Sequence, residues 1–152
     1  MKKSFWALSL AILLAAGIAA AAEHGGSPMR GGAEHPGTAI NADFVKKSIK
    51  DHVKRLSKAT DGVFVIRDDQ LGKEWRLKLD KIHDPVRKFV RDGKTVYFTC
   101  SDFRAADSAD LLDIDFWMVE KDGELEVIDT KIHKLNGVPR FTYEGTKIKE
   151  VK

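Results

Sequence analysis

The feature that most constrains the fold is a single change of hydrophobic period at Asp61-Gly62. Before it, apolar residues recur every three or four positions: Val45, Ile49, Val53 and Leu56. This spacing predicts one amphipathic helix, which begins after the N-cap residue Asn41 and ends at Asp61-Gly62. After it, apolar and polar residues alternate, as they do in half-buried strands. One helix followed by strands predicts an α+β domain in which the helix packs on the apolar face of a curved antiparallel sheet.

The alternating part of the chain divides into candidate strands separated by turn residues. They cover residues 63–67, 75–82, 95–103, 111–120, 125–133 and 140–143. A break at residues 83–85 follows the second strand, and Asn136-Gly137 is a typical two-residue hairpin turn. Pro139 cannot donate a ladder hydrogen bond, which places the last strand at an edge. We therefore expect a sheet of four to six strands, with residues 41–152 forming one domain.

The order of these elements resembles that of the cystatin-like group of folds, which includes the NTF2-like proteins. The resemblance extends from Asn41 to Glu144 and includes the hairpin sequence at residues 117–127. It implies one helix lying across the concave face of a curved antiparallel sheet.

Short segments of the chain are also similar to a group of uncharacterised exported bacterial proteins. The segments are Glu34-His35-Pro36-Gly37, Cys100-Ser101-Asp102-Phe103, Asp113-Ile114-Asp115-Phe116 and Ile132-His133-Lys134. This resemblance covers nearly the whole chain after its first 22 residues. It implies export, and it brings no particular activity with it.

Residues 1–22 have the composition of a cleaved signal peptide. Two lysines precede a long apolar run that ends at Ala20-Ala21-Ala22, where small side chains suit signal peptidase. No basic cluster follows the run, so we expect cleavage after Ala21 or Ala22 and no stable membrane insertion afterwards. Residues 23–40 are rich in glycine, proline and histidine and are expected to form a flexible linker. The expected location is the periplasm or the exterior of the cell.

Charge and cysteine content restrict the function further. The formal net charge is +3, and two of the positive charges belong to the leader, so the exported form is close to neutral. A near-neutral protein has no general attraction to nucleic acid.

Cys100 is the only cysteine, which excludes an intramolecular disulfide, and its strand-like surroundings predict a buried, unreactive thiol. The alternative is an exposed redox or dimerising thiol, which needs a cationic neighbour.

The candidate ligand-binding residues lie in strand contexts: Asp102, Asp113, Asp115, Trp117, His133 and Arg140. Asp113 and Asp115 alternate with Ile114, which places the acids on the sheet face opposite the helix. We expect that face to be solvated, with its acids paired to basic side chains on neighbouring strands. Two alternatives stay open. The carboxylates can bind a hard cation, or Asp102, Asp115 and His133 can act as acid–base groups of an NTF2-like enzyme in a cavity beside Trp117.

The predicted linker carries a separate candidate metal site, formed by His24, Met29 and His35. Cleavage after Ala21 would leave a histidine in third position, where the terminal amine, two amides and the imidazole form the square-planar nitrogen set that copper and nickel prefer. No glycine-rich phosphate loop, Cys-x-x-Cys motif or nucleophile elbow occurs, so no cofactor is expected.

These observations favour an exported, non-enzymatic binding or accessory protein. Its ligand is predicted to be a periplasmic protein or a small molecule, and the edge strand near Pro139 also allows a homodimer through sheet-edge pairing. The NTF2-like enzyme and a periplasmic metal-handling protein for copper, nickel or zinc are the alternative functions.

Overall fold

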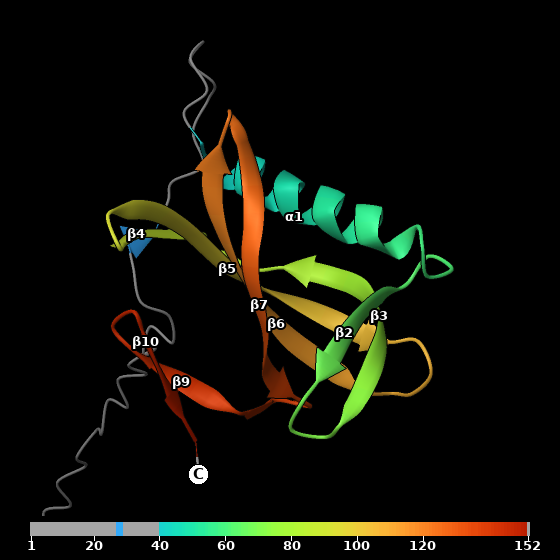
Figure 1. Ribbon diagram of the computed structural model, residues 1–152. Coiled ribbons are helices and arrows are strands. Elements are labelled where there is room, and N and C mark those ends of the chain that lie inside the picture. Colours follow the sequence, from blue (N-terminus) through green and yellow to red (C-terminus); the bar gives the residue numbers. More distant parts are fainter. Residues whose placement is uncertain (1–26, 29–39, 152) are drawn as a thin grey trace, which may run out of the picture.

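The computed structural model describes residues 27–28 and 40–151 of the chain (Figure 1). The predicted signal peptide and most of the predicted linker lie outside these residues. Helix α1 (Ala42–Ser57) packs against a strongly curled antiparallel sheet that forms half a barrel. The predicted α+β class, with one helix on a curved antiparallel sheet, is confirmed.

Six strands of five or more residues form the half-barrel: β2 (Phe64–Asp68), β3 (Lys73–Ile82), β4 (Arg87–Arg91), β5 (Lys94–Ala105), β6 (Leu111–Lys121) and β7 (Glu124–Leu135). The two-residue strands β1 (Ser27–Pro28) and β8 (Val138–Pro139) pair with β4 and β7. Strand β1 belongs to the segment predicted as linker. β9 (Phe141–Glu144) and β10 (Lys147–Glu150) form a separate hairpin.

Strands β3 and β4 pair with successive parts of one edge of β5, and β6 pairs with its other edge. The break between β3 and β4 coincides with the predicted one and contains a cis peptide bond before Pro85. Strand β4 was not predicted, because its sequence alternates poorly and carries three charged residues in five. It forms because the turn at Asp92-Gly93, where both residues have positive φ, folds it back onto β5.

Helix α1 is fixed at both ends by local backbone bonds. Its N-cap is the predicted one: the side-chain oxygen of Asn41 accepts a hydrogen bond from the backbone N–H of Phe44 at 2.8 Å. The helix ends at Ser57, earlier than predicted, because the chain turns there. The N–H of Gly62, which has φ +78°, donates to the carbonyl of Ser57 at 2.9 Å.

The main core lies between α1 and the concave face of the sheet. Val45 and Ile49 of the helix are fully buried in one cluster with aromatic rings of the sheet. The ring of Phe116 lies 6.1 Å from that of Phe103 and 6.4 Å from that of Phe64. Because Ile114 and Phe116 are completely buried on this side, the predicted division of β6 into a helix-facing apolar side and an opposite acidic side is correct.

The opposite face of the sheet is covered by the β9–β10 hairpin, not by solvent as the sequence predicted. Phe141 stacks on His133 with ring centroids 4.8 Å apart, and Tyr143 packs edge-on against Phe98 at 5.5 Å. Phe98 and Trp117 belong to a second buried cluster on this face. The last predicted strand therefore does not extend the main sheet, and only β8 adds to β7.

Candidate functional site

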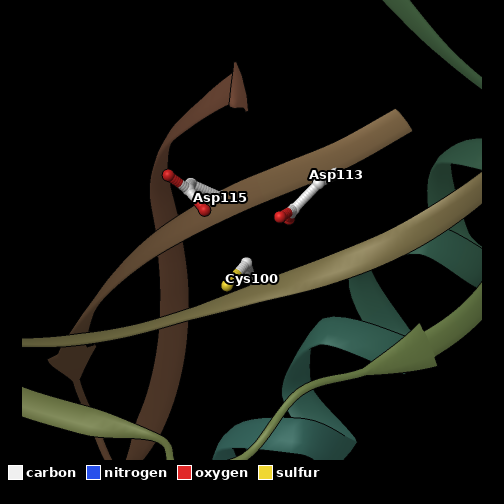
Figure 2. Close-up of side chains that lie close together, drawn as sticks. All are labelled: Cys100, Asp113 and Asp115. Atoms are coloured by element: carbon white, nitrogen blue, oxygen red, sulfur yellow. The ribbon is translucent and has the colours of Figure 1, made fainter. Parts of the chain in front are cut away.

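Five polar side chains meet beneath the β9–β10 hairpin, and we call them the buried polar cluster: Cys100, Asp113, Asp115, His133 and Tyr143. The sheet register assembles most of the cluster, because Cys100 of β5 lies opposite Asp115 of β6. Figure 2 shows the three side chains together, with Cys100 on β5 and the two aspartates on the neighbouring strand β6. One donor atom from each of Cys100, Asp113 and Asp115 lies within 4.8 Å of the other two.

His133 lies at a β-bulge in β7. Asp113 pairs with Lys134 whereas the next residue, Ile114, pairs with Ile132, so His133 is the extra residue of the ladder. Because Ile132 is buried on the helix side, the imidazole of His133 lies on the outer face, where Nδ1 lies 3.7 Å from Oδ2 of Asp113 and 3.7 Å from Oδ2 of Asp115. Strict alternation along β7 does not reveal such a bulge.

Asp115 is at the centre of the cluster and is completely buried. The hydroxyl of Tyr143 donates a hydrogen bond to its Oδ2 at 2.5 Å. Asp113 is nearly buried, with 12% of its side chain exposed, and the ammonium of Lys134 approaches its Oδ2 at 3.8 Å. The hairpin therefore closes the cluster through Tyr143, while Lys134 lies at its rim.

Burial controls the protonation of this cluster. It raises the pKa of Asp115 well above its ordinary value; the hydrogen bond from Tyr143 opposes this effect, and the neighbouring charge of Asp113 adds to it. Burial and the carboxylates of Asp113 and Asp115 raise the pKa of the Cys100 thiol, which is 6% exposed. The predicted buried, unreactive thiol is confirmed in its burial, and its raised pKa disfavours the nucleophilic thiolate.

The prediction that Asp113, Asp115 and His133 face solvent is wrong. His133 is only 2% exposed, because Phe141 stacks on it. The sequence does contain a pattern that indicates burial of this outer face of the sheet. Val96, Phe98 and Cys100 of β5 are apolar on the same face as the acids, which is typical of a strand buried on both sides.

The other three predicted ligand-binding residues have separate partners. Asp102 lies opposite Asp113 in the ladder, but its Oδ1 is 2.8 Å from Nε2 of His83. The ring of Trp117 packs on that of Phe98, with centroids 5.2 Å apart. Arg140 contributes to a different ion pair: its guanidinium donates two hydrogen bonds of 2.8 Å to the buried carboxylate of Asp68.

An open groove lies between α1 and the β6–β7 hairpin, and we call it the α1–β7 groove. Its volume is about 750 Å³, and it is lined by Phe44, Lys47, Ser48, Asp51, His52 and Arg55 of α1 and by residues 121–127 of the hairpin. A second groove of about 410 Å³ lies between the C-terminal half of α1 and β3, with Val53 and Leu77 in its lining. Asp102, Asp115 and His133 line neither groove. Sequence reasoning missed both grooves, because they depend on how α1 lies across the sheet.

The candidate metal residues of the linker, His24, Met29 and His35, lie outside the described residues. In the part of the chain that the structure describes, no helix is long and apolar enough to cross a membrane.

Comparison of the chain with protein-family models, curated proteins and solved structures found no match. The function is therefore inferred from the fold, the buried polar cluster and the two grooves.

We expect Tyr143→Phe to lower the free energy of unfolding by about 1–3 kcal/mol, because it removes the donor to a completely buried carboxyl group. Urea denaturation followed by circular dichroism measures the loss. Tyr97→Phe is the matched control, since this substitution removes a hydroxyl from a half-buried ring on the helix side of the sheet. Equal losses in the two variants would contradict the role given to the Tyr143–Asp115 hydrogen bond.

Proposed function

We propose that this chain is an exported, non-enzymatic binding protein that holds an extended segment of a partner protein in the α1–β7 groove. One observation carries the proposal: the groove runs beside an edge of the sheet that is open over most of its length. Among the described strands, β8 pairs only with Lys134 and Leu135 of β7, which leaves the rest of that edge available. Extended peptides bind such edges by adding a strand.

The register of the β6–β7 hairpin indicates which backbone groups of β7 are available. The two-residue turn at Asp122-Gly123 is flanked by the pair Lys121 and Glu124. In such a hairpin the flanking pair is hydrogen-bonded, and hydrogen-bonded and non-hydrogen-bonded pairs then alternate. The backbone N–H and C=O groups of Leu125 and Val127 are therefore directed away from β6, toward the open edge.

The side chains along the groove suit a segment with apolar residues at alternate positions. Phe44, Leu125 and Val127 line the groove and are only half-buried. Its charged residues are partly paired within the protein: Lys47 contacts Asp51 at 2.6 Å, and Lys121 contacts Glu126 at 3.6 Å. Backbone hydrogen bonds would supply affinity, and the apolar floor would supply specificity.

Site-specific photo-crosslinking tests this proposal in cells. A benzophenone amino acid in place of Asp51, which is exposed in the groove, is expected to capture a defined partner. The same probe in place of Asp69, which is exposed far from the groove in the β2–β3 turn, is the control. Equal capture from both positions, or from neither, would contradict the groove. A crosslink to a second copy of this chain would identify the predicted homodimer as the occupant.

Two substitutions at one position separate the backbone contact from the side-chain contact. Val127→Pro removes the outward N–H without removing a bond to β6, whereas Val127→Ala keeps the N–H and shortens the side chain. We expect Val127→Pro to abolish the crosslink from position 51 and Val127→Ala to weaken it only. If both variants behave alike, the partner does not bind by strand addition.

The enzymatic alternative has less support, because Asp102, Asp115 and His133 line neither groove. Export rests on the predicted leader, and mass spectrometry of the mature N-terminus tests it: a chain that begins at Ala22 or Glu23 is expected. We also propose, from the order of elements alone, that the domain is cystatin-like.

A further inference from the structure

We propose that Cys100, Asp113, Asp115 and His133 form a structural binding site for a divalent transition metal of the zinc class. The inference is independent of the proposed function, because it concerns the opposite face of the sheet from the α1–β7 groove. It rests on the identity of the four donors, on their separation and on the hydrogen bonding of Asp115.

The donor set selects the class of metal. One thiol, one imidazole and two carboxyl groups are the ligand types that Zn²⁺ accepts in four-coordinate sites. Ca²⁺ and Mg²⁺ require oxygen ligands and do not use a thiol or an imidazole, so the set disfavours these cations. The four donors come from three adjacent strands, β5, β6 and β7, and all four residues are buried or nearly so.

Three of the donors lie close together, and His133 lies near the two carboxyl groups. With metal–ligand bonds of about 2.0–2.3 Å and tetrahedral angles, neighbouring donors lie roughly 3.3–3.7 Å apart. The imidazole Nδ1 of His133 lies 3.7 Å from Oδ2 of Asp113 and 3.7 Å from Oδ2 of Asp115. The donors of Cys100, Asp113 and Asp115, which Figure 2 shows together, lie within 4.8 Å of one another, so metal binding would require these three donors and His133 to move closer together.

The hydrogen bonding of Asp115 is a second and independent observation. Its Oδ2 accepts the hydrogen bond from Tyr143, which fixes the orientation of the carboxyl group as outer-shell partners of metal ligands do. Its Oδ1 is buried and has no hydrogen-bond partner among the residues that the structure describes. A buried carboxyl oxygen without a partner is costly, and a cation bound at Oδ1 would remove that cost.

Binding would offset most of the negative charge of the ligands and release protons. A divalent ion compensates two buried carboxylates, and it displaces the Cys100 thiol proton, as metal–thiolate bonds require. Four protein ligands leave no open coordination position, so the site is structural and not catalytic. It would tie three adjacent strands together in a chain whose single cysteine excludes an intramolecular disulfide.

Metal titration of the purified full chain, freed of metal with a chelator, tests the site. We expect one Zn²⁺ per chain by elemental analysis, and a rise in Tm of roughly 10 °C at a hundredfold excess over Kd. Co²⁺, used as a coloured substitute, should give a sulfur-to-cobalt charge-transfer absorption. No stoichiometric metal together with an unchanged Tm would overturn the proposal.

Matched variants assign the ligands. Cys100→Ser should abolish the charge-transfer band, and Asp113→Asn should weaken Zn²⁺ binding at least tenfold. Asp102→Asn is the control, because Asp102 is a carboxylate on the same face that pairs with His83 instead. Circular dichroism of each metal-free variant shows whether it folds. Zn²⁺ binding that survives Cys100→Ser and Asp113→Asn but is lost on His24→Ala and His35→Ala would place the metal in the linker and overturn the site.

Substitution of Lys134 is expected to strengthen Zn²⁺ binding, unlike the substitutions of the ligands. Its ammonium lies 3.8 Å from Oδ2 of Asp113, so it competes with a bound cation for that oxygen. Lys134→Met should therefore tighten Zn²⁺ binding several-fold while leaving the donor set intact. Unchanged or weaker binding in this variant would contradict coordination by Asp113.

Discussion

Phe116→Ala is expected to lower the free energy of unfolding by about 3–5 kcal/mol. Phe116 is completely buried at the centre of the main core, where its ring meets those of Phe64, Phe103 and His52. Truncation removes these contacts and leaves a cavity. The surrounding helix and strands cannot move in to fill it, because their other packing contacts hold them in place. Chemical denaturation monitored by tryptophan fluorescence measures the loss.

Val90→Ala is the control for this substitution, because Val90 is 70% exposed on β4 and its truncation should change stability by less than about 0.5 kcal/mol. A loss below about 1 kcal/mol in Phe116→Ala would mean that the helix does not pack on this face of the sheet.

Arg140→Ala is expected to have a similarly large effect, about 3–5 kcal/mol, through electrostatics and not through packing. Asp68 is 1% exposed, and its carboxylate accepts hydrogen bonds from Arg140, from the indole of Trp75 at 2.8 Å and from the backbone of Leu71. Removing the guanidinium leaves a buried anion without its counter-charge. The same loss frees the hairpin from β2, because Arg140 immediately precedes β9.

Two comparisons isolate this electrostatic contribution. Arg104→Ala breaks an exposed pair with Asp80 and should cost less than about 1 kcal/mol. Adding Asp68→Asn to Arg140→Ala should recover part of the loss, since the uncompensated charge is then absent. A double variant that is less stable than Arg140→Ala alone would contradict the explanation.

The Arg140–Asp68 ion pair also predicts how the free energy of unfolding depends on pH. The hydrogen bonds from Arg140, the largest effect, lower the pKa of Asp68 from 3.8 to about 2. A carboxyl group with a lowered pKa in the folded state stabilises the protein above its unfolded pKa, and this contribution is lost as pH falls. The contribution, about 2 kcal/mol, should therefore be present above pH 4 and disappear between about pH 4 and pH 2. In Arg140→Ala this acid dependence should be weaker.

The sequence predicted the helix-facing half of the molecule well. The cap at Asn41, the spacing of Val45 and Ile49, and the alternation around Ile114 and Phe116 are local patterns, and each was decided by residues close in the chain. The fold class followed from them because one apolar helix face and one apolar sheet face have few other ways to be buried.

The other half of the molecule depends on contacts between distant residues. Tyr143 reaches Asp115 across 28 positions, and Arg140 reaches Asp68 across 72, and no local period indicates either contact. Strand β10 escaped prediction because Lys147–Glu150 carries mostly charged residues and is exposed throughout. Of the six predicted ligand-binding residues, Asp113, Asp115 and His133 lie together. Their burial was not predicted, because the hairpin that buries them follows them in the chain.

The open edge of β7 is the central element of the proposed binding function, and amide hydrogen exchange of Leu125 and Val127 tests it most directly. In the free protein both amides should exchange rapidly, while that of Glu126, which is bonded to β6, exchanges slowly. Addition of the crosslinked partner or its binding segment should slow exchange at Leu125 and Val127 by at least tenfold. Slow exchange at both amides in the free chain, or no change on binding, would contradict strand addition at this edge.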